Sequence, residues 1–276
     1  MVVGQDAAGP PADDAGSAAQ LQRRFGGLER LYGVSGAARI RNAHVVVVGI
    51  GGVGSWTAEA LARSGVGRLT LIDMDHVAES NINRQAHALT STIGQAKVLA
   101  MRDRIAQIHP GCMVQCIDDF VEPDNWPGML PSGKVDALID ACDQIKAKTA
   151  LAVWARDQKI VHIAVGAAGG KRHAHRVDID DLAHTTHDPL LAQLRYRLRK
   201  FHRAPREGKK IGVTCVYSKE AVAPPDASCN IEGDGSLNCH GYGSVVAVTA
   251  TFGQCAAGWV LDKLGTNSQK PQKLTL

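Results

Sequence analysis

Four glycines and an aspartate in the first third of the chain have the spacing of a nucleotide-binding turn. The residues are Gly49, Gly51, Gly52 and Gly54, directly after a run of four valines, and Asp73 at the end of the next apolar run. Glycines at such a turn let backbone N–H groups and the start of the next helix face a phosphate, and the acid accepts hydrogen bonds from ribose hydroxyls. The pattern GxGxxG alone also suits a dinucleotide-dependent dehydrogenase. A P-loop ATPase is excluded because Ser55 stands where its lysine would follow.

Two cations and a further acid favour ATP over a dinucleotide. Arg84 lies in a polar segment after Asp73, and Lys97 lies at the start of the next helical pattern. A triphosphate carries more negative charge than a dinucleotide pyrophosphate, and two cations meet that need. Asp143 follows another apolar run, where a carboxylate can hold magnesium. We therefore expect ATP and Mg²⁺ to bind here.

Apolar runs and helical patterns alternate up to residue 165 and supply the elements that position these side chains. Strands are expected at 45–48, 69–72, 113–117, 135–139 and 160–165, and helices at about 95–108 and 146–156. Valine-rich runs are typical of parallel strands buried on both faces. The alternation predicts an α/β fold with a doubly wound, mostly parallel, Rossmann-like sheet, whose strand ends bind ligands.

The second half is less regular, and we interpret it as a C-terminal elaboration of strands with a basic and an apolar helix. The basic helix is expected near 189–201, a strand near 213–217, and an uncharged helix within 241–261. The uncharged segment is long enough to span a bilayer. Its four glycines and several polar residues favour instead a helix packed in the core or at a subunit interface.

Positive charge is concentrated in residues 195–210. This segment holds eight Lys or Arg and one Glu, a charge of +7, whereas the whole chain carries +4, so the remainder sums to −3. Such a cluster with interleaved aromatic residues is typical of a nucleic-acid-binding surface. We expect tRNA contacts from its eight cations: Arg195, Arg197, Arg199, Lys200, Arg203, Arg206, Lys209 and Lys210.

Cysteine usage indicates a reducing compartment. The chain has seven cysteines, an odd number, and no CxxC pair, which argues against a disulfide framework and against a zinc site. Cys215 lies in an expected strand close to Lys219 and Glu220. Its thiolate is a candidate nucleophile on an activated carboxylate, although a buried structural cysteine is the commoner outcome in such a strand.

The combined motifs resemble the ubiquitin-activating-enzyme-like adenylyltransferases, which include the ThiF, MoeB and HesA proteins. The resemblance is carried by the glycine turn and by Asp73-Met74-Asp75, Asn83-Arg84-Gln85, Gly94-Gln95-Ala96-Lys97 and Asp140-Ala141-Cys142-Asp143. It implies that Asp73 holds the ribose, that Arg84 and Lys97, beside Asn83, hold the phosphates, and that Asp143 holds magnesium. Arg84, Lys97 and Asp143, with Cys215, are then the candidate catalytic residues.

Further motifs extend the resemblance over nearly the whole chain and narrow it to the tRNA threonylcarbamoyladenosine dehydratases. They are Arg24-Phe25-Gly26-Gly27, Arg30-Leu31-Tyr32-Gly33, Gly166–Gly170, Asp188-Pro189-Leu190, Val213–Glu220 and Thr249–Gly253. This resemblance implies an enzyme that uses ATP to activate the carboxylate of threonylcarbamoyladenosine, next to the anticodon, and cyclises it with loss of water. Two alternatives stay open: an adenylyltransferase for a small ubiquitin-like sulfur-carrier protein, and a non-catalytic, nucleotide-dependent RNA-binding module.

The domain organisation and partners follow from the same resemblance. We expect a disordered leader over 1–20, a single ThiF-like adenylating domain over 21–264 and a flexible tail over 265–276. Within the domain, 40–165 forms the nucleotide-binding half and 166–264 the substrate-binding half. A cytoplasmic homodimer is expected, without membrane contact, with Arg24 or Arg30 reaching the partner subunit. A sulfur-transfer system of the cysteine desulfurase type is a further expected partner.

Overall fold

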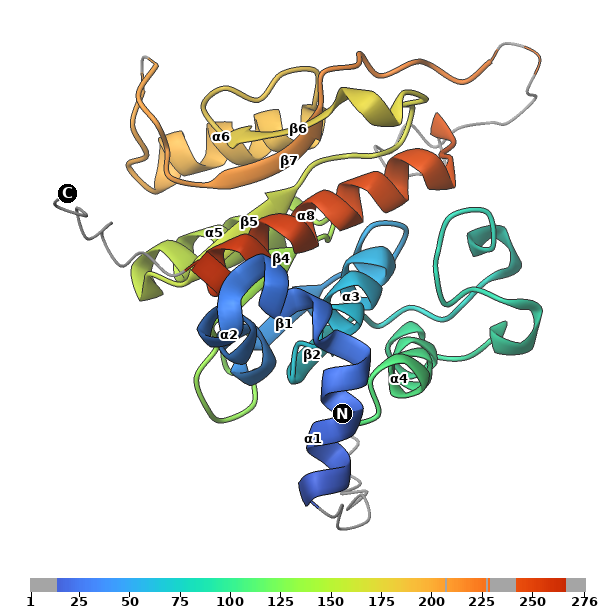
Figure 1. The fold of residues 1–276 in the computed structure, drawn as a ribbon. Helices are drawn as coiled ribbons and strands as arrows, with labels where there is room; N and C mark the ends of the chain where they lie inside the picture. Colours follow the sequence, from blue (N-terminus) through green and yellow to red (C-terminus); the bar gives the residue numbers. More distant parts are fainter. Residues whose placement is uncertain (1–13, 207, 227, 229–241, 267–276) are drawn as a thin grey trace, which may run out of the picture.

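A seven-stranded sheet in the order β3-β2-β1-β4-β5-β7-β6 organises the protein. The computed structural model describes residues 14–206, 208–226, 228 and 242–266 (Figure 1). The strands are β1 (His44–Val48), β2 (Arg68–Ile72), β3 (Met113–Ile117), β4 (Ala137–Asp140), β5 (Val161–Val165), β6 (Val177–Asp181) and β7 (Thr214–Ser218). All neighbouring strands are parallel except β6 and β7, which confirms the predicted fold class.

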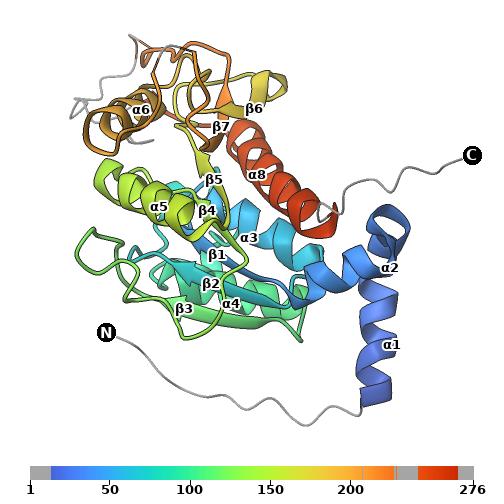
Figure 2. The same ribbon diagram turned by 90° about the vertical axis from the view of Figure 1, so that its left-hand side faces the viewer.

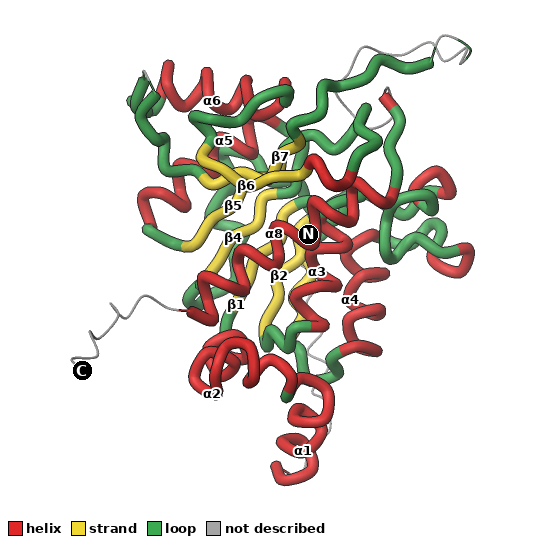
Figure 3. The backbone as a smooth tube through the Cα atoms, turned by 45° about the horizontal axis from the view of Figure 1, so that its top comes forward, coloured by secondary structure: helices red, strands yellow, loops and turns green. Residues whose placement is uncertain are grey.

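Helices cover both faces of the sheet. They are α1 (Asp14–Phe25), α2 (Gly27–Asn42), α3 (Gly54–Arg63), α4 (Lys97–Ile108), α5 (Ile145–Gln158), α6 (Pro189–Phe201) and α8 (Val246–Thr266), with short 3-10 turns at Glu79–Asn81, Thr90–Thr92 and Ala174–Arg176. Helix α5 packs with α6 on one face, whereas α3, α4 and α8 lie on the other (Figure 2). Figure 3 shows the strands between these two layers.

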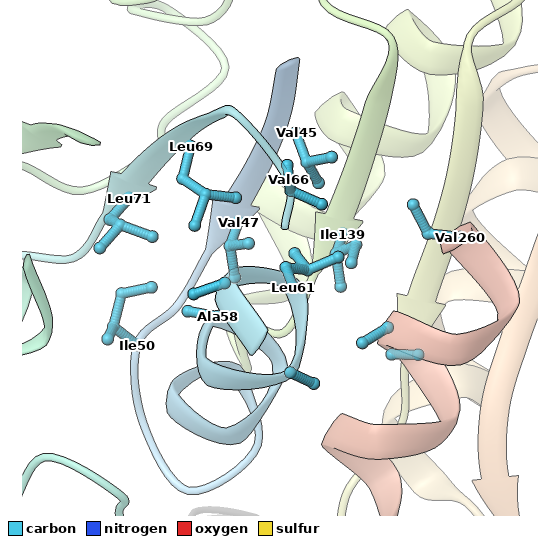
Figure 4. Close-up of a cluster of buried hydrophobic side chains, with 14 of the residues drawn as sticks. Val45, Val47, Ile50, Ala58, Leu61, Val66, Leu69, Leu71, Ile139 and Val260 are labelled. Carbon is cyan, nitrogen blue, oxygen red and sulfur yellow. The ribbon is translucent and has the colours of Figure 1, made fainter. Parts of the chain in front are cut away.

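The core is built around β1. All five of its residues are buried, as expected for a central strand covered on both faces. Val45 and Val47 point into a cluster with Leu61 of α3, Leu69 of β2 and Val260 of α8 (Figure 4). The valine run therefore fixes β1 at the centre of the sheet, and the glycine turn that follows it lies at the sheet's carboxyl edge.

Helix α8 is a core helix, as the sequence favoured. It packs against α2, α3 and β5 within the same chain. A Cβ on Gly253 would lie 2.7 Å from the carbonyl oxygen of Val53, so this glycine permits close packing on α3. Across the described part of the chain, no helix combines the length and apolar character needed to cross a bilayer.

Some boundaries differ from the sequence predictions. Helix α1 begins at Asp14, inside the segment 1–20 expected to be disordered, and α8 continues to Thr266, past the expected domain end at 264. The rest of the expected leader and tail lies outside the described residues. The antiparallel strand β6 was not predicted. Its sequence Val-Asp-Ile-Asp-Asp pairs at the sheet edge with β7, and all its residues are only partly buried.

Candidate nucleotide-binding site

The strand order places the glycine turn at a crevice in the sheet. From β1 the chain continues outward through β2 and β3, whereas β4 pairs with the other side of β1 and leads to β5. Connections therefore diverge on either side of the β1–β4 pair, and ligands of doubly wound sheets bind at such a point, outside the carboxyl ends of the strands. The segments that leave β1, β2 and β4 carry the glycine turn, Asp73 and Asp143.

The glycines of the turn fall into two pairs with different roles. Gly49 has a φ of +84°, and a Cβ there would lie 2.8 Å from the carbonyl carbon of Ala141; a Cβ on Gly54 would lie 1.7 Å from the oxygen of Gly49. These two positions are therefore needed for the turn to pack against itself and the β4 loop. A Cβ on Gly51 would meet nothing within 4 Å, and one on Gly52 would meet Arg84 at 3.4 Å. The space beside Gly51 is where a phosphate can approach the backbone.

The N-terminus of α3 produces a positive electrostatic potential in this space. No side chain caps the helix at Val53, and its first turn carries no acidic residue. The N–H groups of a helix's first turn lack intrahelical partners, and the helix dipole favours an anion there. The turn and α3 together form a phosphate cradle of backbone atoms.

Asp73 connects the end of β2 to the glycine turn. Its Oδ2 accepts a hydrogen bond from the backbone N–H of Ile50 at 2.6 Å, and its Oδ1 accepts one from Asp75 N–H at 2.9 Å. Burial raises the pKa of Asp73, an effect that the nearby Lys97 ammonium opposes. The carboxylate thus fixes the shape of the turn, and the oxygens' other lone pairs remain for a ligand hydroxyl.

Lys97 is the first residue of α4, two residues after the expected helix start, and its side chain is buried. Its Nζ pairs with Asp75 Oδ2 at 2.6 Å, and its backbone N–H donates to Asp75 O. The Asp75 side chain is 55% exposed. Asp75 therefore orients the lysine, a role that its place in the motif did not reveal.

Arg84 is buried beside Gly52 and held from several elements. Its Nη1 donates to Ser80 O at 2.7 Å and to Asn83 Oδ1 at 2.9 Å. Its own carbonyl accepts a hydrogen bond from Trp56 Nε1 of α3 at 2.9 Å. The Asn83 amide thus orients the guanidinium, and the indole of Trp56 fixes the backbone of this segment relative to the turn.

Asp143 is exposed in the loop between β4 and α5. The loop starts at Ala141, whose N–H donates to Val48 O at 2.8 Å, so it lies directly beside the glycine turn. In the described part of the chain, no group of three or more His, Cys, Asp or Glu residues is arranged to hold a metal. A single exposed carboxylate nonetheless suits Mg²⁺, which keeps several waters and shares its remaining ligands with substrate phosphates.

A buried ion pair stabilises the loop that carries Asp143. Lys148 Nζ lies 2.9 Å from Asp140 Oδ1, and neither side chain is exposed. Burial alone would lower the pKa of Lys148, but the Asp140 carboxylate outweighs this and raises it, which keeps the lysine charged. Cys142 Sγ also donates to Asp140 Oδ1, at 3.0 Å. The pair connects the end of β4 to α5, and the sequence reasoning missed Lys148.

The structure argues against Cys215 as a nucleophile. The residue is fully buried in β7, and its Sγ donates to Val213 O at 3.6 Å. Burial raises the pKa of the thiol well above its ordinary value, so the reactive thiolate is disfavoured. Cys215 packs in the core between the sheet and α6. The apolar residues around it in the sequence were the signal for this role.

Five of the eight cations of the basic cluster are exposed, and the other three, on α6, are partly buried. Arg195 is half-buried, and its Nη1 donates to Leu182 O and to Thr185 O, both at 2.9 Å. It therefore holds the segment between β6 and α6, which makes Arg195 less available for the predicted tRNA contact than the exposed cations of the cluster. The exposed cations of the cluster are Lys200, Arg203, Arg206, Lys209 and Lys210, with Arg197 and Arg199 partly exposed.

The end of α6 and the cations that follow it lie near the amino ends of the strands, whereas the glycine turn lies at the carboxyl ends. Helix α6 starts near the carboxyl edge, where Asp188 Oδ2 accepts a hydrogen bond from Ala167 N–H just after β5. It ends near the last turn of α5, where Arg156 Nη1 donates to His202 O. Its 13 residues span roughly 20 Å. Figure 1 shows α6 behind β6 and β7, on the same side of the sheet as α5.

The sheet, the glycine turn and the flanking cations define a Rossmann-like nucleotide-binding protein. The ThiF family profile matches residues 23–275, and the chain belongs to the ThiF family. It is 44% identical over 245 residues to the tRNA threonylcarbamoyladenosine dehydratase of Haemophilus influenzae, covering 88% of this chain and 94% of the relative. The predicted resemblance is therefore confirmed.

Solved structures agree with the sequence relatives. The crystal structure of the E. coli tRNA N6-threonylcarbamoyladenosine dehydratase in complex with ATP matches with a TM-score of 0.80 and 44% identity, over 89% of this chain and 95% of that chain. The same enzyme is also known in complex with AMP. The molybdopterin-synthase adenylyltransferase of Salmonella typhimurium is 32% identical, but only over 50% of this chain and 55% of its own length.

Proposed function

We propose that the protein is an ATP-dependent tRNA-modifying enzyme that activates the carboxylate of threonylcarbamoyladenosine next to the anticodon and cyclises it with loss of water. The observation that carries this proposal is the open cradle at Gly51, flanked by Arg84 and Lys97. The likeness to dehydratases along nearly the whole chain supplies the substrate class.

Each site residue has a proposed role in binding ATP. Backbone N–H groups of the turn and the start of α3 bind phosphate oxygens beside Gly51. Asp73 accepts hydrogen bonds from the ribose. Lys97 and Arg84 neutralise phosphate charge in a partly desolvated setting, where charge-assisted hydrogen bonds are strongest. Asn83 orients Arg84 through the bond to its Nη1.

Asp143 is the proposed ligand of Mg²⁺. Its exposed carboxylate beside the glycine turn fits a metal that bridges protein and phosphate oxygens. The ion would supply charge neutralisation and polarisation of the phosphate. The Asp140–Lys148 pair keeps the loop that presents Asp143 in place.

The proposed chemistry needs no protein nucleophile, in agreement with the burial of Cys215. A carboxylate oxygen of the substrate attacks a phosphorus atom of ATP and breaks a P–O bond of the triphosphate, with release of pyrophosphate or ADP according to which phosphorus is attacked. A nitrogen of the same substrate then attacks the activated carbonyl carbon and loses its proton, the C–O bond to the phosphorylated oxygen breaks with release of AMP or phosphate, and a ring closes. Because nucleophile and electrophile belong to one molecule, holding them in position supplies much of the rate.

For tRNA binding we propose the exposed cations of 197–210, without Arg195. Their distance from the glycine turn means that they hold a part of the tRNA away from the reacting nucleotide. Lys and Arg side chains on phosphates supply most of the sequence-independent affinity for nucleic acid. A tRNA is large enough to contact both edges of the sheet.

We further propose that the protein acts as a homodimer in the cytoplasm. Leu31 and Val34 of α2 are 73% and 69% exposed, an apolar pair suited to burial against a second copy. Arg30 is exposed next to them, whereas Arg24 Nη1 donates to Ile108 O of its own chain, so Arg30 is the better candidate to reach the partner. A sulfur-transfer partner of the cysteine desulfurase type stays a prediction.

The test is the mass of the modified nucleoside. The protein is incubated with ATP, magnesium and tRNA that carries threonylcarbamoyladenosine, and the nucleosides are analysed by mass spectrometry. The expected product is lighter by one water, and tRNA without the modification should give none. An unchanged mass together with adenylation of a sulfur-carrier protein would favour the first alternative. ATP binding without turnover would favour the RNA-binding module.

A further inference from the structure

Two exposed aromatic side chains stand within the basic cluster of α6. Tyr196 is 59% exposed and Phe201 is 57% exposed. Tyr196 lies on the side of α6 away from Leu191, Leu194 and Leu198, which are buried in the core, whereas Phe201 is the last residue of the helix and is exposed beyond the end of this leucine row. Neither ring contributes to the hydrophobic core, so their exposure has no explanation in the packing of the chain.

Cations hold both rings in place. Lys200 Nζ lies 5.3 Å from the centroid of the Tyr196 ring and 5.2 Å from that of Phe201, and it donates to the tyrosine hydroxyl at 2.9 Å. The Arg197 guanidinium lies 5.6 Å from the Phe201 ring, and its Nε donates to Thr149 Oγ1 of α5. Cation–π contacts of this kind favour a fixed ring orientation. The four side chains form one patch, here called the α6 platform (Tyr196, Arg197, Lys200 and Phe201).

We propose that the α6 platform stacks unpaired bases of the tRNA. This inference rests on the proposed tRNA-modifying function and specifies what the basic cluster recognises. The local charge of +7 over 195–210 attracts the phosphate backbone, and the rings then meet the bases that the backbone carries. Bases within a duplex are already stacked on each other, so only unpaired bases offer a free face.

The position of the platform determines which bases it can contact. Phe201 ends α6 near His202, at the edge of the sheet away from the glycine turn. The stacked bases are therefore different from the nucleotide that reacts near ATP. The platform is a positioning device: it affects how tightly the tRNA binds and in which register, and it takes no part in the chemical step.

The first test measures tRNA affinity of the full-length protein for Tyr196→Ala, Phe201→Ala and the double variant. Removing the ring on which a base stacks should weaken binding about tenfold per ring. The slope of log K against log salt should stay unchanged, because every cation that pairs with a phosphate is still present. The KM for tRNA should rise in parallel, whereas kcat and the KM for ATP should not change.

Three control variants separate stacking from bulk and from hydrophobicity. Tyr196→Phe keeps a ring and should bind like the wild type, whereas Phe201→Leu keeps an apolar side chain without a ring face and should bind weakly. Phe120→Ala removes a 46% exposed ring that lies outside the basic cluster and should have no effect. Light scattering of the double variant should give the wild-type mass.

A fluorescence measurement reports stacking directly. The base analogue 2-aminopurine is placed at successive unpaired positions of the substrate tRNA. Wild-type protein should change the 2-aminopurine emission at one or two positions, and the double variant should not.

If the double variant binds tRNA as the wild type does, the proposed role of the platform is overturned while the proposed function stands. If wild-type protein binds no tRNA, the proposed function fails and the platform with it. A changed mass of the double variant would show that the rings form an interface between copies, which also overturns the proposal.

Discussion

At the scale of single residues, Gly51 and Gly54 should respond differently to the same substitution. Gly54→Ala places a Cβ 1.7 Å from the Gly49 oxygen and should destabilise the fold by about 3 kcal/mol. Gly51→Ala meets no protein atom within 4 Å, so the fold should be unaffected. Its methyl group would occupy the phosphate cradle and weaken ATP binding about tenfold, or about 1.4 kcal/mol. Calorimetric ATP titration and thermal unfolding measure both effects. Equal ATP affinity for Gly51→Ala and the wild type would place the phosphates elsewhere.

Lys97→Ala should reduce catalysis without unfolding the protein. A charge-assisted contact to a phosphate contributes about 1.5–3 kcal/mol, so kcat/KM should fall roughly tenfold or more. The variant leaves behind Asp75, which is 55% exposed and tolerates the removal of its partner. Arg102→Ala on the same helix removes an exposed cation and serves as the matched control. Wild-type turnover by Lys97→Ala would show that the lysine's only role is to pair with Asp75.

What the sequence revealed at this scale depended on whether the signal was local. The nucleotide-binding role of the glycines and of Asp73 could be predicted from the sequence, because glycines and an acid at the ends of two successive apolar runs have few other roles. Asp75 and Lys148 were missed because their partners, Lys97 and Asp140, are known only once strands and helices are placed. For Cys215 the sequence left a nucleophile and a buried structural residue open, and its burial in β7 favours the structural role.

At the scale of secondary-structure elements, the Asp140–Lys148 pair joins β4 to α5. Lys148→Ala would leave a buried carboxylate without a counter-charge, which typically costs about 3–5 kcal/mol. Urea denaturation should show this decrease in stability, and Lys146→Ala, at an exposed position of the same helix, should show none. The double variant Asp140→Asn with Lys148→Met removes both charges and should recover part of the stability. An unchanged urea midpoint for Lys148→Ala would contradict the anchoring role.

The elements that sequence patterns identified are those with a strong periodic signal. The central strands are mostly apolar, and their bounds agree with the structure to within about two residues. Strand β6 was not predicted from the sequence because its acidic side chains face solvent at the edge of the sheet, so few of its residues are apolar. Helix α2 gives a weak pattern for a different reason: Gly33, with a φ of +72°, interrupts it with a kink.

At the scale of the whole molecule, the topology separates the two binding regions. The carboxyl ends of parallel strands all lie at the same edge of a sheet. The nucleotide-binding residues, which come from distant parts of the chain, therefore lie close together there. Helix α6 runs back across the sheet and carries the basic cluster to the opposite edge. The sequence shows both regions but not the distance between them, because this depends on the direction in which α6 packs.

This separation predicts that the basic cluster affects tRNA binding alone. Lys209 and Lys210 are exposed in the connection between α6 and β7, at the edge away from Gly51. Replacing both by alanine should raise the KM for tRNA and reduce the slope of log K against log salt by about 1 for each lysine that pairs with a phosphate. The KM for ATP should not change, since neither lysine can reach the cradle across a helix length of roughly 20 Å.

Lys263→Ala, which replaces an exposed lysine on α8, is the matched control and should leave both KM values unchanged. Steady-state kinetics at several salt concentrations measure all of these quantities. A parallel rise in the KM for ATP would show that the two edges are coupled, and an unchanged salt slope would show that the tRNA backbone lies elsewhere on the protein.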